Sequence, residues 1–317
     1  MPLRVLIADT LHPGFARLFA EAGIVYDYCP EITREELRTA LPGFDGLVIR
    51  SKTRVDADLL ANANIRFVAR AGAGIDNLDE AWLTSRGIRI LNAPEGNRDA
   101  VGEHTTGMIL SLLHNLHRSH QEVTNGIWQR EANRGYELGS MTVGIVGLGN
   151  TGSALAHKLQ GFGCRIIAYD KYLTKSPLPA VPLVPMQELF EQADILSLHI
   201  PLTDETRAMA NYDYFKRFRQ LRMFVNTSRG EIAPLADLAR ALTDGLFEMA
   251  ALDVLEDEKL TTLTPAQQEA FDTLKASGRV LFTPHIAGWT HESYVRINEV
   301  LVKKIAALEN QLPDSEN

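Results

Sequence analysis

Cysteine is scarce in this chain, since only Cys29 and Cys164 occur among its 317 residues. The two lie far apart and belong to no CxxC pair or Cys/His cluster, so nothing supports a disulfide framework or a zinc site. We expect both cysteines to be buried, inert core residues, and no metal site is predicted in the chain.

The chain also lacks long hydrophobic runs and clusters of positive charge. Its first apolar run, residues 5–8, ends at Asp9 and is too short for a signal peptide or a membrane span. Lysine and arginine number 32 against 40 acidic residues, which gives a net charge of −8 and disfavours a nucleic-acid partner. We therefore expect a cytoplasmic protein that binds neither nucleic acid nor membrane.

What the chain does contain is a regular alternation of short apolar strands with helical segments. Its length is enough for about two domains. In the first part, strands such as LRVLIAD, GLVIR and IRILN alternate with helices, one of which is expected from about Asp56. Thr33 and Glu36 stand at capping-box spacing, which predicts a helix start. This alternation is typical of a parallel sheet covered on both faces.

A second series of strands follows a long helix that is predicted from about residue 100 to residue 120. Its strands are MTVGIVG, CRIIAYD, DILSLHI, MFVNTS, EMAALD and VLFTPH. We predict an α/β fold of two doubly wound parallel-sheet domains with a cleft between them. A flavodoxin-like substrate domain would comprise residues 1–98 and 287–317, because the last helix, at about 291–309, has no strand after it and could return to the first sheet. A Rossmann domain would comprise residues 99–286.

The segment MTVGIVGLGNTG places Gly147, Gly149 and Gly152 in GxGxxG spacing between a strand and a helix. The first two glycines let backbone amides approach a pyrophosphate, and the third lets the helix pack closely on the strand. Asp170 ends the next strand, 18 residues beyond Gly152. A carboxylate there would accept hydrogen bonds from ribose hydroxyls and would repel the extra phosphate of NADP. The second domain is therefore predicted to bind NAD.

Polar side chains close four consecutive strands of the second sheet. They are His199, Ser228 with Arg229, Asp253 and His285. Ligands of open α/β sheets bind beyond the carboxyl ends of the strands, so we expect these groups at one crevice. For His199 alone, a purely structural role as a hydrogen-bonded histidine is equally open.

The segments RAGAGIDNLD, GLGNTG, NTSRGEI, AALDVLEDE and TPHIAGWT, in this order, resemble those of the D-isomer-specific 2-hydroxyacid dehydrogenases, and among them the D-3-phosphoglycerate dehydrogenases. The resemblance covers nearly the whole chain. It implies an NAD-dependent oxidoreductase that interconverts a D-2-hydroxy acid and its 2-keto acid, with Arg229, Glu258 and His285 as catalytic residues. Besides Arg229, His285, the glycine turn and Asp170, the implied NAD contacts are Ala73, Asn150, Thr151, His199, Ile200, Thr227, Ser228, Asp253 and Gly288.

The chemistry of this reaction assigns a role to each catalytic residue. Oxidation of a hydroxy acid removes the hydroxyl proton as hydride leaves C2, so a base that titrates near neutrality is needed. His285 suits this role, and Glu258 would hold its ring and stabilise the protonated form. Arg229 would pair with the substrate carboxylate and polarise the C2 oxygen. The resemblance also implies that Ala73 and Gly74 offer backbone amides near the substrate carboxylate, and the remaining expected substrate contacts are Arg50 and Ser51.

Some residues leave the assignment of the substrate open. Lys259 follows Glu258 where the family usually has proline, and Trp289 stands where a small residue is common, so it would reshape the acyl pocket. Glu258 is chosen mainly for its offset of five from Asp253, and Glu256 is its nearest rival. Arg50, Lys52 and Arg54 alternate along one predicted strand edge, so their side chains could share a face that binds an anion. Arg50 is the best candidate because it is nearest the carboxyl end of the strand, whereas Lys52 and Arg54 are more typical of a solvated edge.

Two alternatives remain for the function. A glyoxylate/hydroxypyruvate reductase or a D-lactate-type dehydrogenase would use the same scaffold. A protein that senses NAD without turnover belongs to a different class, and the intact catalytic residues argue against it. The long helix and the loop NGIWQREANRGYELG resemble the dimer-forming region of the family, which implies a homodimer.

Overall fold

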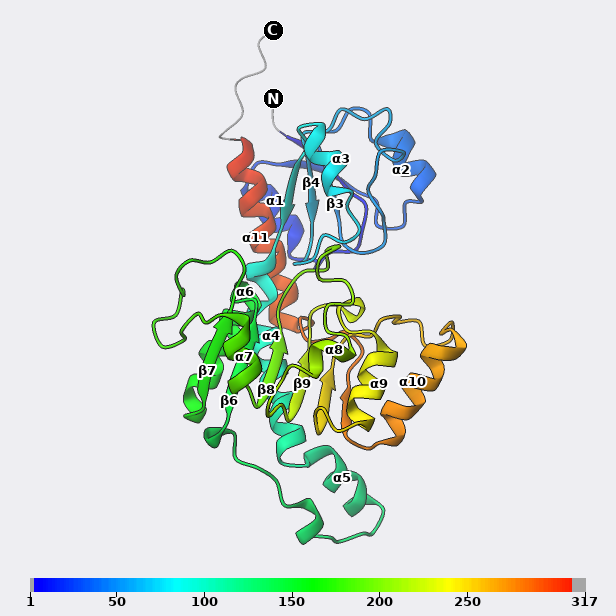
Figure 1. The fold of residues 1–317 in the computed structure, drawn as a ribbon. Coiled ribbons are helices and arrows are strands. Elements are labelled where there is room, and N and C mark those ends of the chain that lie inside the picture. The colour runs from blue at the N-terminus through cyan, green and yellow to red at the C-terminus, as the bar shows by residue number, and fades with distance from the viewer. Residues whose placement is uncertain (1–2, 310–317) are drawn as a thin grey trace. The chain divides into compact units, whose positions relative to one another are not determined.

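The protein, seen in a computed structural model that describes residues 3–309, divides into two compact units (Figure 1). Unit 1 consists of residues 1–97 and 289–317, and unit 2 of residues 98–288. Each unit contains one sheet whose strands are all parallel, so the predicted fold class is confirmed. Within the described residues, no helix combines the length and the hydropathy that a membrane span needs.

The sheet of unit 1 has the strand order β2-β1-β3-β4-β5, which is the flavodoxin-like order. Its strands are β1 (Arg4–Ile7), β2 (Val25–Tyr28), β3 (Gly46–Ile49), β4 (Phe67–Arg70) and β5 (Arg89–Asn92). Its helices are α1 (Phe15–Glu21), α2 (Arg34–Ala40), α3 (Glu80–Ser85) and α11 (His291–Glu309). The capping box predicted at Thr33 and Glu36 starts α2.

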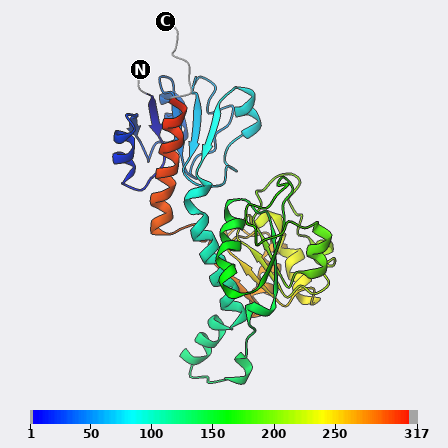
Figure 2. The ribbon, with the colours of Figure 1, turned by 90° about the vertical axis from the view of Figure 1, so that its left-hand side faces the viewer.

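Alternate residues of each strand in unit 1 point to opposite faces of the sheet, and this alternation builds two cores. Val5 and Ile7 of β1 belong to the core with α1 and α11, whereas Leu6 belongs to the core on the other face, with α2 and α3. Figure 2 shows α11 running along one face of the unit 1 sheet, where it contacts α1. The C-terminal helix is thus part of the hydrophobic core formed by the first strands of the chain.

The sheet of unit 2 has the strand order β11-β10-β9-β8-β6-β7. Its strands are β6 (Thr142–Val146), β7 (Arg165–Tyr169), β8 (Ile195–Leu198), β9 (Met223–Asn226), β10 (Met249–Leu252) and β11 (Val280–Phe282). The helices after the first strand are α6 (Asn150–Leu159), α7 (Met186–Gln192), α8 (Tyr212–Phe215), α9 (Leu235–Thr243) and α10 (Pro265–Ala276). The strand order reverses between β6 and β8, which is where open sheets of this type bind ligands.

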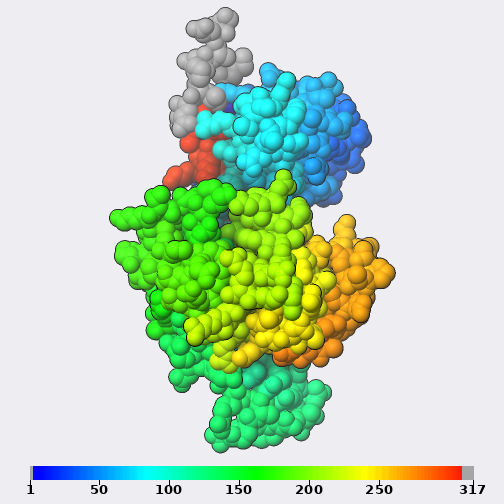
Figure 3. Space-filling view, in the orientation of Figure 1, coloured from blue at the N-terminus to red at the C-terminus, as the bar shows by residue number. Residues whose placement is uncertain are grey.

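Both faces of the unit 2 sheet are covered. Val143 and Ile145 of β6 pack with α6 and with α4 (Pro94–Leu113), while Val146 of the same strand packs with the core formed by α7, α9 and α10. After α4 the chain forms α5 (Leu116–Thr124) and the short 3-10 turns η1 (Glu131–Asn133) and η2 (Leu138–Ser140). Figure 3 shows that α5 and the loop after it project from the body of unit 2.

Three local predictions were wrong. Residues 57–62 form turns instead of a helix, because the Asp56 carboxylate accepts hydrogen bonds from the Leu59 amide and the Arg34 guanidinium, and β4 begins soon after. The predicted long helix begins earlier, at Pro94, and ends at Leu113, because Asn115 adopts a left-handed conformation with φ of 52°. The cysteines are only half-buried, and they pack at the margins of the cores.

Candidate active site

The turn between β6 and α6 carries the three glycines of the GxGxxG segment. Gly147 has φ of +91°, and a Cβ there would lie 2.3 Å from the carbonyl oxygen of His199. A Cβ on Gly152 would lie 1.9 Å from the carbonyl oxygen of Gly147, so only glycine lets α6 pack this closely. At Gly149, in contrast, a Cβ would meet open space. The first turn of α6 therefore presents backbone amides on an open side, which suits an anion such as a phosphate.

The ring of His199 lies between the end of β8 and the first turn of α6. Its Nε2 is 2.9 Å from Ser197 Oγ, and its Nδ1 is 3.2 Å from Thr151 Oγ1. Burial lowers the pKa of His199 to about 4, so the ring is neutral at pH 7. A neutral imidazole donates from one nitrogen and accepts at the other. His199 therefore links the strand to the Thr151 hydroxyl beside the glycine turn.

Asp170, directly after β7, joins two turns at the edge of the sheet. Its Oδ1 accepts the amides of Tyr172 and Leu173 at 2.9 and 3.1 Å, and its Oδ2 accepts the amide of Leu148 at 2.9 Å. A carboxylate offers about four lone-pair sites, so Oδ2 retains one for a further donor. The side chain is thus fixed in place and can still accept a hydroxyl.

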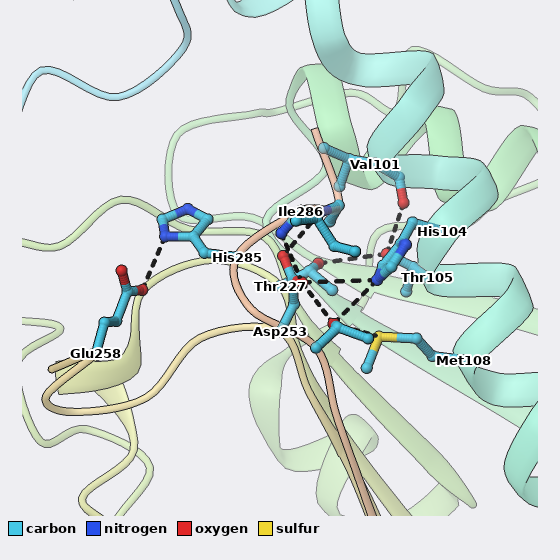
Figure 4. A network of polar contacts seen from close by, with 11 residues as sticks. Val101, His104, Thr105, Met108, Thr227, Asp253, Glu258, His285 and Ile286 are labelled. Carbon is cyan, nitrogen blue, oxygen red and sulfur yellow. Dashed lines mark hydrogen bonds and ion pairs between the residues drawn. The ribbon is translucent and has the colours of Figure 1, made fainter. Parts of the chain in front are cut away.

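His285 and Glu258 point toward each other (Figure 4), with His285 Nδ1 2.8 Å from Glu258 Oε1. Their side chains are 45% and 50% exposed, so the pair is open to a ligand. Within residues 3–309, no hydrogen bond to His285 Nε2 is found. The His285 backbone has φ of 54°, a left-handed conformation that is uncommon for residues other than glycine. The ring is therefore oriented through one nitrogen while the other remains available for proton transfer.

The rival carboxylate, Glu256, has a different partner. Its Oε2 accepts the amide of Leu235 at 3.0 Å, at the start of α9. The amide of Lys259, where the family usually has proline, donates to Asp257 Oδ1 at 2.8 Å, a hydrogen bond that proline could not make. The geometry therefore favours Glu258 as the carboxylate beside His285.

Asp253, directly after β10, organises the backbone around His285. Its side chain has no exposed surface. Oδ1 accepts the Ile286 amide at 2.9 Å (Figure 4) and the Thr283 hydroxyl at 2.5 Å. Oδ2 accepts the Ala287 amide at 2.9 Å. These hydrogen bonds offset the cost of burying the carboxylate. They also fix the segment that carries His285 at the end of β10.

Two residues of α4, His104 and Thr105, add to the hydrogen bonds around Asp253 and the neighbouring strand ends. No sequence motif indicates that either belongs to the site. His104 Nε2 lies 3.1 Å from Thr283 Oγ1 and 3.6 Å from Asp253 Oδ1. Thr105 Oγ1 lies 3.3 Å from Thr227 Oγ1 at the end of β9. Both residues are in the middle of a helix, so only the packing of α4 on the sheet brings them to the strand ends.

Arg229 begins the 3-10 turn η4 (Gly230–Ile232) after β9. Its Nη1 donates to the carbonyl of Ser228 at 2.6 Å, and the Ser228 hydroxyl donates to the carbonyl of Leu198 at 2.6 Å. A Cβ on Gly230 would lie 1.9 Å from the carbonyl carbon of Leu255. The backbone after Arg229 is therefore packed directly against the segment that leads to Glu258.

Unit 1 contains the remaining predicted site residues, at the carboxyl ends of β3 and β4. These strands pair with Ile49 opposite Arg70, so the turns that follow them start side by side. One turn contains Arg50 and Ser51, and the other contains Ala73 and Gly74, which are half-buried. Lys52 and Arg54 have other contacts: the Lys52 ammonium donates to the carbonyls of Pro30 and Ile32, and Arg54 lies 3.7 Å from Asp56.

The chain resembles known proteins along nearly its whole length. Residues 106–287 match the family model of the D-isomer specific 2-hydroxyacid dehydrogenase, NAD binding domain. A hydroxypyruvate reductase of Thermotoga maritima is 35% identical over 95% of this chain and 97% of its own length. A D-3-phosphoglycerate dehydrogenase of Archaeoglobus fulgidus is 30% identical over 98% of this chain, which spans 58% of that protein. A solved protein of Thermus thermophilus superimposes with a TM-score of 0.81 at 28% identity, covering 98% of this chain and 99% of that one.

Proposed function

Because the chain belongs to the D-isomer-specific 2-hydroxyacid dehydrogenases, we propose that it interconverts a D-2-hydroxy acid and its 2-keto acid with NAD. The family, the oxidoreductase class and the cofactor expected from the sequence are confirmed. The observation that supports turnover, as opposed to NAD sensing, is the His285–Glu258 pair, whose Nδ1 and Oε1 atoms are 2.8 Å apart. A binding protein would need no such pair.

His285, Glu258 and Arg229 have different roles in the proposed reaction. NAD, when bound, takes the hydride from C2 of the hydroxy acid or returns it to the keto acid. In the direction of reduction, protonated His285 donates from Nε2 to the C2 oxygen, and in oxidation the neutral ring takes the proton back. Glu258 orients the ring through Nδ1, and Arg229 binds the carboxylate of the acid.

We assign NAD to unit 2, with Ala73 of unit 1 as a further proposed contact, and the substrate contacts Arg50, Ser51, Ala73 and Gly74 to unit 1. The glycine turn fits the cofactor, because the position of a Gly149 Cβ is open and the amides of α6 begin there. His199 and Ser228 use their side chains within the fold, so they would approach the cofactor through their backbone. The other residues that we propose to contact NAD are Ala73, Asn150, Thr151, Ile200, Thr227, Asp253 and Gly288.

Asp170→Asn should reduce the preference for NAD over NADP. The amide keeps the size of the carboxylate and removes the charge that would repel the 2′-phosphate of NADP. The measurement is kcat/KM for both cofactors in wild type and variant, with Asp213→Asn, an exposed aspartate of α8, as the control. Equal efficiency with both cofactors in the wild type would contradict the assignment of Asp170.

Anionic 2-keto acids should be reduced, whereas neutral ketones and aldehydes of similar size should not, because Arg229 is proposed to bind the carboxylate of the substrate. A panel of acids, followed by the loss of NADH absorbance, tests this. We propose 3-phosphohydroxypyruvate among the good substrates. The reductase of matching length favours hydroxypyruvate as the second candidate. If no phosphorylated acid is reduced while glyoxylate or pyruvate is turned over rapidly, the chain would be assigned to the reductases. If the protein binds NAD but reduces none of the acids, it would be an NAD sensor.

We further propose a cytoplasmic homodimer. The projecting α5 and its following loop expose apolar side chains that a monomer would leave in water, namely Leu116, Val123, Ile127 and Trp128, of which Trp128 is 83% exposed. A second copy would cover them. A monomeric mass in light scattering would contradict this proposal.

A further inference from the structure

The backbone of the proposed proton donor, His285, has a left-handed conformation that its neighbours must maintain. Its φ is 54°, and such a torsion in a residue with a Cβ persists only where the surrounding structure fixes it. The His285 amide donates to the carbonyls of Asp253 and Thr283, at 2.7 and 3.0 Å. The next two amides, of Ile286 and Ala287, donate to the Asp253 carboxylate. The position of His285 therefore depends on how firmly Asp253 is fixed.

The Thr283 hydroxyl has a single proton to donate, and this determines the direction of two hydrogen bonds. Thr283 Oγ1 is 2.5 Å from Asp253 Oδ1 and 3.9 Å from Met108 Sδ. A carboxylate accepts more strongly than a thioether sulfur, so the proton points to Asp253. His104 Nε2 lies 3.1 Å from the same hydroxyl oxygen. Because the hydroxyl proton is already used, Nε2 must carry the proton of this second bond. The hydrogen bonds therefore run from His104 through Thr283 to Asp253.

His104 belongs to a different element from the groups that it supports. It lies in the middle of α4, and Figure 4 shows its ring beside Asp253 and apart from the His285–Glu258 pair. Its side chain is 23% exposed, whereas that of Asp253 has no exposed surface. Within residues 3–309, no hydrogen bond to His104 Nδ1 is found. The hydrogen bond of the ring is thus directed to Thr283, and through it α4 is tied to the segment that carries His285.

We propose that His104 is a positioning residue for the reaction, which acts on His285 through Thr283 and Asp253 without touching the substrate. Hydrogen bonds that end at a charged group are stronger than neutral ones, and linked hydrogen bonds strengthen each other. Loss of the first donor should therefore loosen residues 283–287. This inference rests on the proposed function, in which His285 passes the proton. All four residues belong to unit 2.

The first test needs no turnover, because it determines which nitrogen of His104 carries the proton. The nitrogen chemical shifts of isotope-labelled imidazole rings report this directly at about pH 9, where an ordinary histidine is neutral. The His104 signals are identified by their loss in His104→Gln. We expect a proton on Nε2, and Thr283→Val should shift its signal because the acceptor is removed. A proton on Nδ1 alone would overturn the inference.

The second test asks whether the hydrogen bonds from His104 hold His285 in place. In His104→Leu and in Thr283→Val, the amides of residues 285–287 should exchange with solvent faster than in wild type, while those of β6 are unchanged. In each variant, kcat for a reduced acid should fall by roughly 3- to 10-fold, with little change in KM. The double variant should be no slower than the slower single variant, because both substitutions break the same series of bonds.

Two further variants separate the hydrogen bond from the mere presence of a side chain. His104→Gln places an amide N–H near the position of Nε2 and should retain most of the turnover and of the protection from exchange. His157→Leu removes an exposed histidine of α6 in the same unit and should match wild type in both. Equal losses in His104→Gln and His104→Leu, or additive losses in the double variant, would overturn the inference.

The outcomes also separate this inference from the proposed function. If no acid is reduced, the proposed function fails, and the nitrogen shifts and exchange rates still decide on His104. If acids are reduced and His104→Leu has the exchange rates and kcat of wild type, the inference alone is wrong.

Discussion

His285→Ala should lower turnover by roughly 10²- to 10⁴-fold, the range expected for the loss of a general acid–base catalyst. The imidazole is the group that we propose passes the proton, and its Nδ1 already contacts Glu258. Binding of NADH should change little, because the glycine turn after β6 is built by other residues. The measurements are kcat for a reduced acid and the Kd of NADH from its fluorescence. Turnover within a few-fold of wild type would contradict the role of His285.

Glu258→Gln should lower turnover, though less than His285→Ala does. Glutamine keeps the shape of the side chain and removes the negative charge from the 2.8 Å contact with His285 Nδ1, so the ring is held less firmly. Glu256→Gln should leave turnover near the wild-type value, because the Glu256 carboxylate accepts the Leu235 amide and does not contact His285. The measurement is kcat for a reduced acid in both variants. A loss on Glu256→Gln and none on Glu258→Gln would show that Glu256 is the partner.

Gly230→Ala should cost both stability and activity. The added Cβ would lie 1.9 Å from the carbonyl carbon and oxygen of Leu255 and 2.4 Å from the amide nitrogen of Glu256, and these backbone atoms cannot move without shifting the segment that leads to Glu258. Overpacking of this kind costs about 1–3 kcal/mol in the free energy of unfolding. Turnover should fall further than stability explains, since Arg229 and the Glu258 segment are forced apart.

The control for this substitution is Gly161→Ala, where a Cβ meets open space and φ is not positive. Its unfolding free energy and turnover should match those of wild type. Urea unfolding and steady-state kinetics on the two variants give the comparison. A Gly230→Ala protein with wild-type stability and turnover would show that the segment after β10 is more adaptable than its packing indicates.

The fold could be predicted because its signals are local. Apolar runs mark β3 and β4, whose residues are buried on both faces but for Arg70, and the capping box at Thr33 marks the start of α2. The helix expected at Asp56 failed because a side-chain hydrogen bond to the Leu59 amide competes with the helix, and its partner Arg34 is 22 residues away. Patterns along the chain do not contain such distant contacts.

The site residues, too, divide into those that local sequence patterns predict and those that only contacts distant in the sequence bring to the site. Asp253 and His285 were accessible to sequence reasoning because each closes a predicted strand, and in the structure they lie one and three residues after β10 and β11. His104 was not, since it lies in the middle of α4 and reaches Thr283 only through the packing of that helix on the sheet. A stack of the Arg50 guanidinium on the Trp289 ring, 4.0 Å from the ring centroid, joins residues 239 positions apart, and only the return of α11 to the first sheet creates it.

The backbone at His285 has a consequence for selection and engineering. Its φ of 54° lies in the left-handed region, which costs a residue with a Cβ about 1–2 kcal/mol. Glycine would adopt this torsion without that cost, so His285→Gly should melt at a higher temperature than wild type while having lost the proposed proton donor. Stability thus favours glycine at position 285, whereas the proposed activity requires histidine there. A library of variants ranked only by melting temperature would therefore discard the histidine that we propose as the proton donor.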